Sequence, residues 1–455
     1  MGTNKLTPDE SISSLLRILI PESYLQYFDF VRVNNLPGCW EIELEEKPNL
    51  IPQVMEGKNG VLDGFCNPIS ILSHAFSLKK IYLVVKRRRW KEPNTDKHYS
   101  NTYDLHPESA KITKEFAAFL KLSIESRPVN LSTVAHLLQL QPKRMYQWYR
   151  DVISDYHSDK AAGNFAKHIL FQADEQTGEI FKEQVVHIFK PENIGETMTI
   201  DEKMIGKKYS VIMSNKSSGK IALLVETMRP PLLQQALKLF GEKLKIIKEI
   251  CCDMSPMLKK LCSEIIPDVR LIIDKFHVVK HIMDAMQSIR LNEKHNIKAK
   301  EKKDIQTPNI NGWSDLELLE KSRYLLFKRK SEWDKEENEI MENVFKKFKT
   351  IETGFQFCEE IREWYSPQNI GKAKGKMANQ LRQWQQRVYD SKSKAFKFIA
   401  RMFDKHEQDI LRYFEKGHTN AIAENINGKI HRFLMCNYGT RDKDFFFYRV
   451  QIYFS

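Results

Sequence analysis

Four carboxylates of this chain stand where an apolar run ends or inside a helical pattern. Asp201 follows Thr-Ile, Asp253 follows Ile-Cys-Cys and Asp274 follows Leu-Ile-Ile, and short apolar runs of this kind are typical of buried strands. Glu424 lies further along in a helical pattern, three residues before Asn427. Carboxylates that converge can hold two divalent ions about 3.5–4 Å apart and promote phosphoryl transfer. The pattern therefore indicates metal-dependent chemistry on a phosphodiester.

Magnesium is the ion that such a site favours, because Mg²⁺ is hard, octahedral and commonly held by a few carboxylates together with substrate phosphate oxygens. We expect two Mg²⁺ ions, for which Mn²⁺ can substitute. Each acid alone is more often structural than catalytic: Asp253 can cap the helix that follows Met-Ser-Pro, and Asp201 can pair with Lys203. Their joint occurrence in one order of elements is much stronger evidence for a site.

The elements that must position these acids follow the order of an RNase H-like core. Three strand-like runs come first, in quick succession, and predict an antiparallel meander: residues 197–201, 209–214 and 220–226. After them an amphipathic helix from Pro230 leads to alternating strand, helix and strand over residues 246–273. This order predicts an α/β fold in which Asp201 and Asp253 end adjacent strands and Glu424 approaches from the closing helix.

The rest of the chain divides by composition. The six predicted parts are a mixed α+β N-terminal domain (1–100), a helix-turn-helix (101–155), a linker (156–195), the first part of an RNase H-like catalytic domain (196–280), a large helical insertion rich in Lys and Glu (281–412) and the last part of the catalytic domain (413–455). The linker is predicted because Gly163, Gly178 and Gly195 punctuate a mostly polar stretch.

The predicted helix-turn-helix covers residues 131–150. Pro142 can open its second helix, where a missing N–H costs little. That helix would present outward four residues of the types that contact phosphates and base edges in a major groove: Lys143, Arg144, Gln147 and Arg150. A plain helical hairpin with a basic face is the alternative.

A second basic cluster follows an apolar strand pattern in the N-terminal domain. It consists of Lys86, Arg87, Arg88 and Arg89, with Trp90 next. Such a cluster can hold phosphates by charge while the ring packs on a sugar or a base. A charged strand end on a solvated edge explains the same residues equally well.

Composition agrees with a nucleic-acid partner. The 455 residues include 72 Lys and Arg against 59 Asp and Glu, a net charge of +13, which favours a polyanion, although many of these side chains will be solvated helix faces. The 7 cysteines form no Cys-x-x-Cys pair, as expected of reduced thiols. No apolar stretch approaches the roughly 20 residues that span a bilayer. We therefore expect a soluble cytoplasmic protein without a membrane partner.

Several motifs resemble those of bacterial insertion-sequence transposases of the ISL-three group. They are Asp253-Met-Ser-Pro, residues 267–281 with the string Asp-Lys-Phe-His-Val-Val-Lys, residues 322–327 and residues 420–429. The resemblance covers roughly residues 105–455, and the Asp-Lys-Phe-His string is highly specific. It implies a nucleoid-associated DDE transposase whose RNase H-like catalytic domain is interrupted by a helical insertion.

The resemblance also implies roles for individual residues. Asp201 and Asp253 match the first two catalytic and metal-binding acids of the family, and Glu424 matches the last. Asp274 and His277 match an Asp-x-x-His element, to which we assign a supporting role near the site, as we do to Asn427. Many relatives begin with a cysteine-rich zinc-binding segment that this chain lacks, so a separate DNA-binding helper protein is a further expectation.

The expected reaction is hydrolysis of a phosphodiester at each transposon end by metal-bound water, followed by attack of the freed 3′-hydroxyl on target DNA. The expected partners are double-stranded DNA, as terminal inverted repeats and as target, and a second copy of the chain, because two ends must be processed together. Two alternatives stay open: a transposase-derived DNA-binding protein without catalysis, and a structure-specific nuclease of the RNase H fold.

Overall fold

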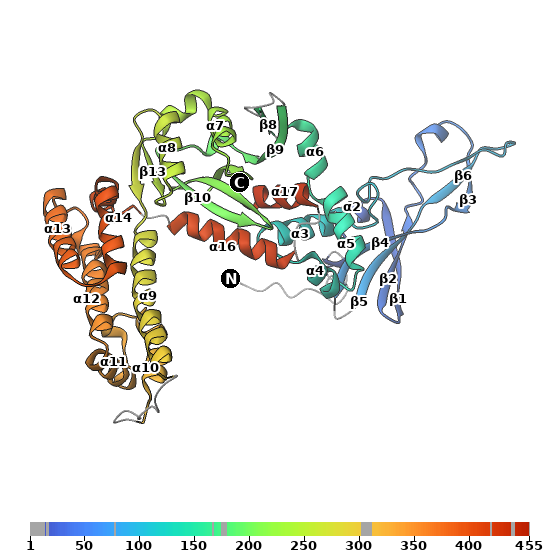
Figure 1. Cartoon of the computed structure of the whole chain (residues 1–455). Helices are drawn as coiled ribbons and strands as arrows, with labels where there is room; N and C mark the ends of the chain where they lie inside the picture. The colour runs from blue at the N-terminus through green and yellow to red at the C-terminus, as the bar shows by residue number, and fades with distance from the viewer. Residues whose placement is uncertain are drawn as a thin grey trace, which may run out of the picture. The chain divides into compact units, whose positions relative to one another are not determined.

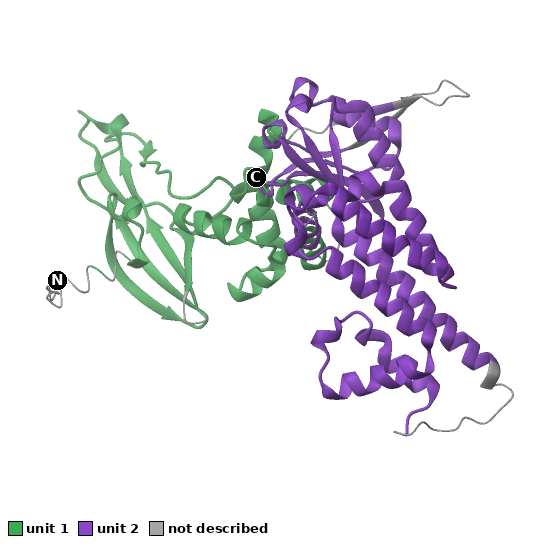
Figure 2. Cartoon of the chain, turned by 90° about the vertical axis from the view of Figure 1, so that its left-hand side faces the viewer, with its two compact units in different colours: residues 1–166, 429–455 green, residues 167–428 purple. Residues whose placement is uncertain are grey.

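The structure is a computed structural model that describes residues 14, 18–76, 79–165, 168–173, 180–301, 312–418, 421–437 and 442–454. Gly178 and Asn420 lie outside these residues. The chain forms two compact units (Figure 2), one of residues 1–166 and 429–455 and one of residues 167–428. Sheets and many helices make it a mixed α/β protein, as predicted. No helix in the described part of the chain is long and apolar enough to cross a membrane.

The second unit is built around a seven-stranded sheet in the order β14-β13-β10-β11-β12-β9-β8 (Figure 1). Its strands are β8 (His168–Ala173), β9 (Ile180–Phe189), β10 (Thr197–Ile205), β11 (Lys208–Asn215), β12 (Ile221–Val225), β13 (Glu249–Cys252) and β14 (Arg270–Ile273). The pairs β10–β11 and β11–β12 are antiparallel, whereas β10–β13 and β13–β14 are parallel. The predicted meander followed by two parallel strands is therefore confirmed.

The apolar residues of these strands place the core. Alternate residues such as Met198, Ile200 and Cys252 are buried against two helices, α7 (Pro230–Lys238) and α8 (Pro256–Ile265), because successive side chains of a strand point to opposite faces. The parallel pairing ends with Ile200 opposite Cys252 and Cys252 opposite Ile273. The next residues are Asp201, Asp253 and Asp274, so the three acids lie where the parallel pairing ends. Asp253 and Asp274 follow their strands, whereas Asp201, predicted at a strand end, lies within β10 and pairs with Ile212 of β11.

Residues 156–195 differ from the predicted linker. They contain a helix, α6 (Tyr156–Ala162), and the two strands β8 and β9. β9 pairs antiparallel with β12 and buries Val186 and Ile188 at alternate positions. The prediction failed because glycines and polar residues obscured a short alternating pattern, whereas the sheet edge at β12 provides a partner for it.

A block of helices follows β14. It consists of α9 (Lys275–Glu301), α10 (Asp315–Leu325), α11 (Lys335–Lys347), α12 (Lys349–Trp364), α13 (Lys374–Asp390) and α14 (Lys394–Leu411). Their apolar residues form one large core. Gly354 lets α12 approach α9 closely, because a Cβ at this position would lie 3.0 Å from Met286 Sδ and 3.1 Å from Ile289 Cδ1. The chain then returns to the sheet through α15 (Tyr413–Lys416) and α16 (Ala421–Cys436).

The first unit contains two smaller sheets and several helices. A four-stranded sheet has the order β1-β2-β5-β4 and a three-stranded sheet the order β3-β6-β7. The strands are β1 (Phe28–Leu36), β2 (Cys39–Glu46), β3 (Val61–Phe65), β4 (Ile69–Phe76), β5 (Lys79–Lys86), β6 (Arg88–Lys91) and β7 (His98–Tyr99). The helices are α2 (Glu22–Leu25), α3 (Lys114–Glu125), α4 (Leu131–Leu137), α5 (Pro142–Trp148), α6 and α17 (Lys443–Tyr453).

The C-terminal segment belongs to this first unit. The rings of Phe445 and Tyr448 on α17 lie 5.2 Å and 5.1 Å from the ring of Tyr156, edge to face. The predicted last part of the catalytic domain, residues 413–455, is thus divided between the two units. The helix of residues 443–453 packs against Tyr156, a distant part of the chain, and its helical sequence pattern carries no information about that contact.

Candidate active site

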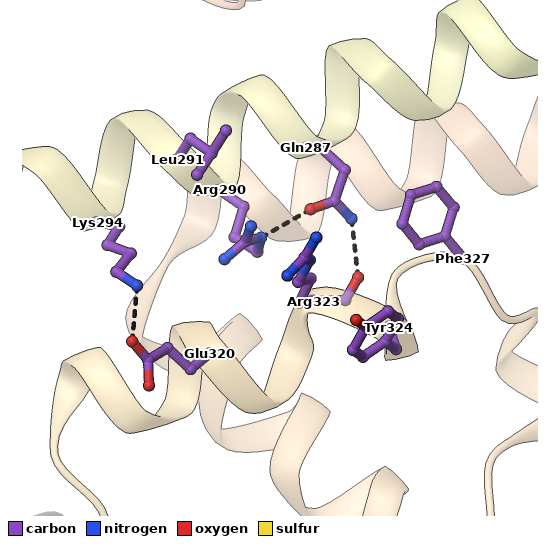
Figure 3. Close-up of a pocket in the computed structure, with 8 residues that line it drawn as sticks. All are labelled: Gln287, Arg290, Leu291, Lys294, Glu320, Arg323, Tyr324 and Phe327. Atoms are coloured by element: carbon purple, nitrogen blue, oxygen red, sulfur yellow. Dashed lines mark hydrogen bonds and ion pairs between the residues drawn. The ribbon is translucent and has the colours of Figure 1, made fainter.

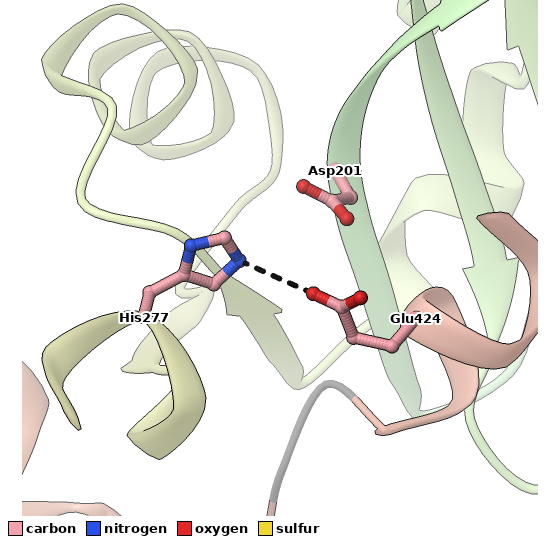
Figure 4. A group of neighbouring side chains, drawn as sticks. All are labelled: Asp201, His277 and Glu424. Atoms are coloured by element: carbon pink, nitrogen blue, oxygen red, sulfur yellow. Dashed lines mark ion pairs between the residues drawn. The ribbon is translucent and has the colours of Figure 1, made fainter. Parts of the chain in front are cut away.

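Three elements of the second unit bring Asp201, His277 and Glu424 together (Figure 4). Asp201 lies on β10, His277 in the first turn of α9 and Glu424 in the first turn of α16. One ligand atom from each side chain lies within 4.8 Å of the others, and Nε2 of His277 is 3.9 Å from Oε1 of Glu424. Asp201 is buried, whereas the other two side chains are partly exposed. The group can therefore meet a ligand from solvent while one carboxylate is held inside.

Hydrogen bonds fix the Asp201 carboxylate. Asn427 donates from Nδ2 to Oδ2 at 2.6 Å, and the backbone N–H of Glu202 donates to Oδ1 at 2.9 Å. Burial raises the pKa of the Asp201 carboxyl, and the negative charges of Glu424 and Asp253 also raise it, against the lowering by the Glu202 N–H and His277. Negative charge is thus concentrated where water is scarce, and a cation would stabilise it.

The donor set fits a divalent ion. His277 Nε2 and Asn427 Oδ1 are buried atoms without a hydrogen-bond partner among the described residues. Two carboxylates suit Mg²⁺ and Mn²⁺, and an imidazole is a common ligand of transition metals such as Mn²⁺. A buried nitrogen that lacks a partner beside two carboxylates is the arrangement expected when an ion supplies the missing interaction.

Asp253 is a neighbour of this group without being a member of it. Its Oδ1 accepts a hydrogen bond of 2.8 Å from the backbone N–H of Ser255, at the start of α8. Its charge raises the pKa of Asp201 and, after burial, that of Glu202. Glu202 also accepts a hydrogen bond from Ser255 Oγ at 3.1 Å, and this acid was not among the predicted site residues. Its adjacency to Asp201 is the only sequence signal that could have drawn attention to it.

Asp274 occupies different surroundings. It is fully buried at the start of α9, where its backbone N–H donates to the carbonyl of Cys252 at 3.0 Å. Its charge contributes, after burial, to the raised pKa values of Tyr365 and Tyr413, which belong to the helical block. The structure therefore brings His277 into the group of three, and Asp274 stands at the base of the helix that carries it.

The residues predicted to contact DNA fall into two sets. In the helix-turn-helix region α4 and α5 are both present, and Lys143, Arg144 and Gln147 are exposed on α5. Arg150 follows α5, and its Nε lies 2.9 Å from Oδ2 of Asp442. Arg150 is therefore half-buried in an ion pair within the first unit, whereas the other three side chains face solvent.

The basic run of the N-terminal sheets is bonded within its own unit. Lys86 pairs with Glu43 at 3.0 Å, Arg87 donates to the carbonyl of Asn101, and Arg88 donates to the carbonyl of Glu46. Arg89, the most exposed of the four, pairs with Asp63 at 3.1 Å. These contacts agree with the charged-edge interpretation and leave Arg89 as the most accessible member of the run.

Comparisons with known proteins bear on this site. No curated protein matches the chain. Among solved structures, a chain of the Drosophila P element transposase strand transfer complex is similar over 71% of this chain and 90% of that chain, with 10% sequence identity and a TM-score of 0.32. Residues 198–450 match the family model described as "Transposase", that of the DDE transposases of the ISL-three type. This range covers more than half of the chain and includes Asp201, His277 and Glu424, so the chain belongs to the ISL-three-type DDE transposases, a family of DNA transposition.

Proposed function

We propose that this protein cuts DNA at the ends of a mobile element and joins the freed 3′ ends to target DNA in a reaction that depends on divalent metal ions. One observation carries the proposal: Asp201, His277 and Glu424 converge from three separate elements, β10, α9 and α16. A partly exposed acidic group built around a buried carboxylate is poorly explained by stability alone, because the repulsion of like charges works against folding.

Asp201, Asp253 and Glu424 are the carboxylates that would hold the ions, with His277 as the imidazole beside them. When bound, two Mg²⁺ ions, or Mn²⁺ in their place, would activate the attacking oxygen and stabilise the leaving oxygen of the phosphodiester. Asn427 keeps the Asp201 carboxylate in one orientation through its hydrogen bond of 2.6 Å. Nε2 of His277 has no hydrogen-bond partner among the described residues and can hold a proton or a ligand there.

The order of strands supports an RNase H-like catalytic domain. Three antiparallel strands, β10 to β12, are followed by the parallel strands β13 and β14, with the helical block α9–α14 inserted before the helix that carries Glu424. We propose that this sheet is the catalytic core and that the helical block is an insertion into it. The same geometry suits both cleavage and joining, since each is an in-line displacement at phosphorus.

DNA would be held at separate surfaces. We propose that Lys143, Arg144 and Gln147 contact the terminal inverted repeats, and that Arg89 adds a phosphate contact. Arg150 would order this region through Asp442 instead of contacting DNA itself. Two ends must react together, so a homodimer assembled on DNA is part of the proposal, as is a helper protein for end recognition.

The test is cleavage and strand transfer on labelled DNA that carries the element's own ends, with Mg²⁺ or Mn²⁺, alongside a binding measurement on the same DNA. Asp201→Asn, Asp253→Asn and Glu424→Gln should bind DNA normally and lose both reactions. Asp274→Asn alters a fully buried residue at the base of α9 that is not among the proposed ion ligands, so it should retain more activity than Asp201→Asn.

Two exposed acids of the same unit provide matched controls. Asp268 has φ 54°, a backbone conformation that Asn tolerates well, and Glu264 lies 3.8 Å from Lys260 in a weak ion pair. Asp268→Asn and Glu264→Gln should therefore cut and join like the unaltered protein. A folded protein that binds the ends but cuts with neither metal would favour a DNA-binding relic, and cutting without regard to end sequence would favour a structure-specific nuclease.

A further inference from the structure

A pocket of about 650 Å³ lies between α9 and α10 in the helical block, on residues that the proposed catalytic site does not use (Figure 3). α9 contributes Arg290 and Lys294, and α10 with the turn after it contributes Glu320, Arg323, Tyr324 and Phe327. Its size lies within the range of roughly 300–1,000 Å³ that is usual for small-molecule sites.

The charges in this pocket do not balance. Three cationic side chains face a single carboxylate, Glu320, and Lys294 already pairs with it at 2.7 Å. Arg290 is buried and held in place, since it donates to Gln287 Oε1 at 2.8 Å and to the carbonyl of Leu319 at 3.0 Å. Burial lowers the pKa of Arg290, and the nearby charge of Arg323 lowers it further, whereas the charge of Glu320 raises it. Two guanidinium groups thus line one pocket, and an anion bound there would be attracted to both.

Arg323 is the group most open to such an anion. It is exposed, and its guanidinium has no ion-pair partner among the described residues. The guanidinium carbon of Arg323 lies over the ring of Tyr324, 5.2 Å from the ring centroid. A guanidinium stacked on an aromatic ring keeps its N–H groups free, and these donors match the oxygens of a phosphate.

Exposed aromatic rings stand beside this cationic centre. The side chain of Tyr324 is 68% exposed and that of Phe327 is 47% exposed, although both rings would gain from burial. Every nucleobase has a flat face that can stack on such a ring, whereas in duplex DNA these faces are covered by neighbouring bases. Phosphate-binding guanidinium groups next to open rings therefore suit an unpaired nucleotide better than a duplex.

We infer that this pocket binds an unpaired nucleotide of a DNA strand, with its phosphate on Arg323 and Arg290 and its base on Tyr324 or Phe327. The inference rests on the proposed function only for the origin of the strand, since cutting at an element end exposes unpaired nucleotides. Strand binding itself requires no catalysis. A free nucleotide offers the same chemistry, and the experiment below separates the two sources.

The experiment measures binding of the full chain, without added metal, to fluorescent DNA of one sequence in three forms: a single strand, a blunt duplex and a duplex with a single-stranded extension. Arg323→Gln and Tyr324→Ala should each weaken binding of the single strand and the extension by about tenfold, because stacking or a phosphate contact of this kind is worth roughly one decade in affinity. The affinity of both variants for the blunt duplex should stay within about twofold of that of the unaltered protein. Tyr324→Phe keeps the ring and should bind like the unaltered protein.

Two substitutions outside the pocket are matched controls. Phe398→Ala removes a ring that is 65% exposed on α14, and Lys346→Gln removes one exposed positive charge from α11. Neither should change binding of the single strand. Arg323 and Tyr324 are exposed, so unchanged thermal unfolding of their variants would show that the fold is intact.

Three outcomes would overturn the inference. The first is equal binding of the single strand by Arg323→Gln, Tyr324→Ala and the unaltered protein. The second is an equal loss in the two control variants, which would mean a diffuse charge effect. The third concerns the part of single-strand binding that the pocket variants lose. If a deoxynucleoside 5′-monophosphate displaces it at concentrations where the unlabelled strand does not, the pocket belongs to a free nucleotide.

Discussion

Replacing Asn427 by Ala should weaken metal binding at the proposed site without unfolding the protein. Asn427 and Asp201 are both buried, and the 2.6 Å hydrogen bond between them is charge-assisted. A hydrogen bond to a charged group contributes roughly 1.5–3 kcal/mol. Since 1.36 kcal/mol corresponds to about tenfold in an equilibrium constant, its loss should lower metal affinity by about 10–100-fold, as is usual for groups that orient a metal ligand.

The assay is metal-dependent cleavage of end DNA as a function of Mn²⁺ concentration. Asn427→Ala should raise the half-saturating Mn²⁺ concentration by about 10–100-fold, and activity should return at high Mn²⁺ because Asp201, His277 and Glu424 are all still present. Asn425→Ala, which alters an exposed residue of the same helix, is the control and should leave the Mn²⁺ dependence unchanged. An unchanged Mn²⁺ dependence in Asn427→Ala would show that this hydrogen bond has no influence on the Asp201 carboxylate as a metal ligand.

Three further perturbations follow from contacts elsewhere. His277→Ala should raise the half-saturating Mn²⁺ concentration while DNA affinity stays constant, and equal Mn²⁺ dependence would remove His277 from the site. Gly354→Ala should lower the free energy of unfolding by about 1–3 kcal/mol through overpacking, because the new Cβ would lie 3.0 Å from Met286 Sδ. Gly375→Ala is the control: its Cβ would have no atom within 4 Å, so thermal unfolding should show no loss of stability. Hydrogen bonds from Arg32 and Lys86 lower the pKa of Glu43 from 4.5 to about 2, so Glu43→Gln should destabilise the protein at neutral pH. The difference in free energy of unfolding between the two proteins should shrink as the pH falls from 4.5 toward 2.

Much of the sheet was predictable from the sequence. Apolar alternation and turn residues identified β10 to β12, and the alternation of helix and strand identified β13 and β14. The strand ends then placed Asp201 and Asp253 on adjacent strands, because parallel strands end at one edge. What the strand pattern could not supply was the direction of each side chain that follows the last parallel pair.

That direction depends on local contacts and distant partners. The Ser255 N–H holds the carboxylate of Asp253, and the turn into α9 buries Asp274 and presents His277 one helical turn later. Arg150 forms an ion pair with Asp442, which lies nearly 300 residues away in the chain. Sequence periodicity reports which face of an element is buried, but it carries no information about a partner so far along the chain.

The most direct test of the metal-dependent site exchanges its ligands for thiols. Asp201→Cys and Glu424→Cys would be assayed for cleavage of end DNA with Mg²⁺ and with Mn²⁺, because a thiolate binds the softer Mn²⁺ better than Mg²⁺. If these carboxylates hold the catalytic ions, both variants lose cleavage with Mg²⁺ and recover part of it with Mn²⁺, while Glu264→Cys, at an exposed acid of α8, behaves like the unaltered protein with either ion. Full cleavage by Asp201→Cys or Glu424→Cys with Mg²⁺ would contradict the account, since the reaction would then proceed without the carboxylates on which it rests.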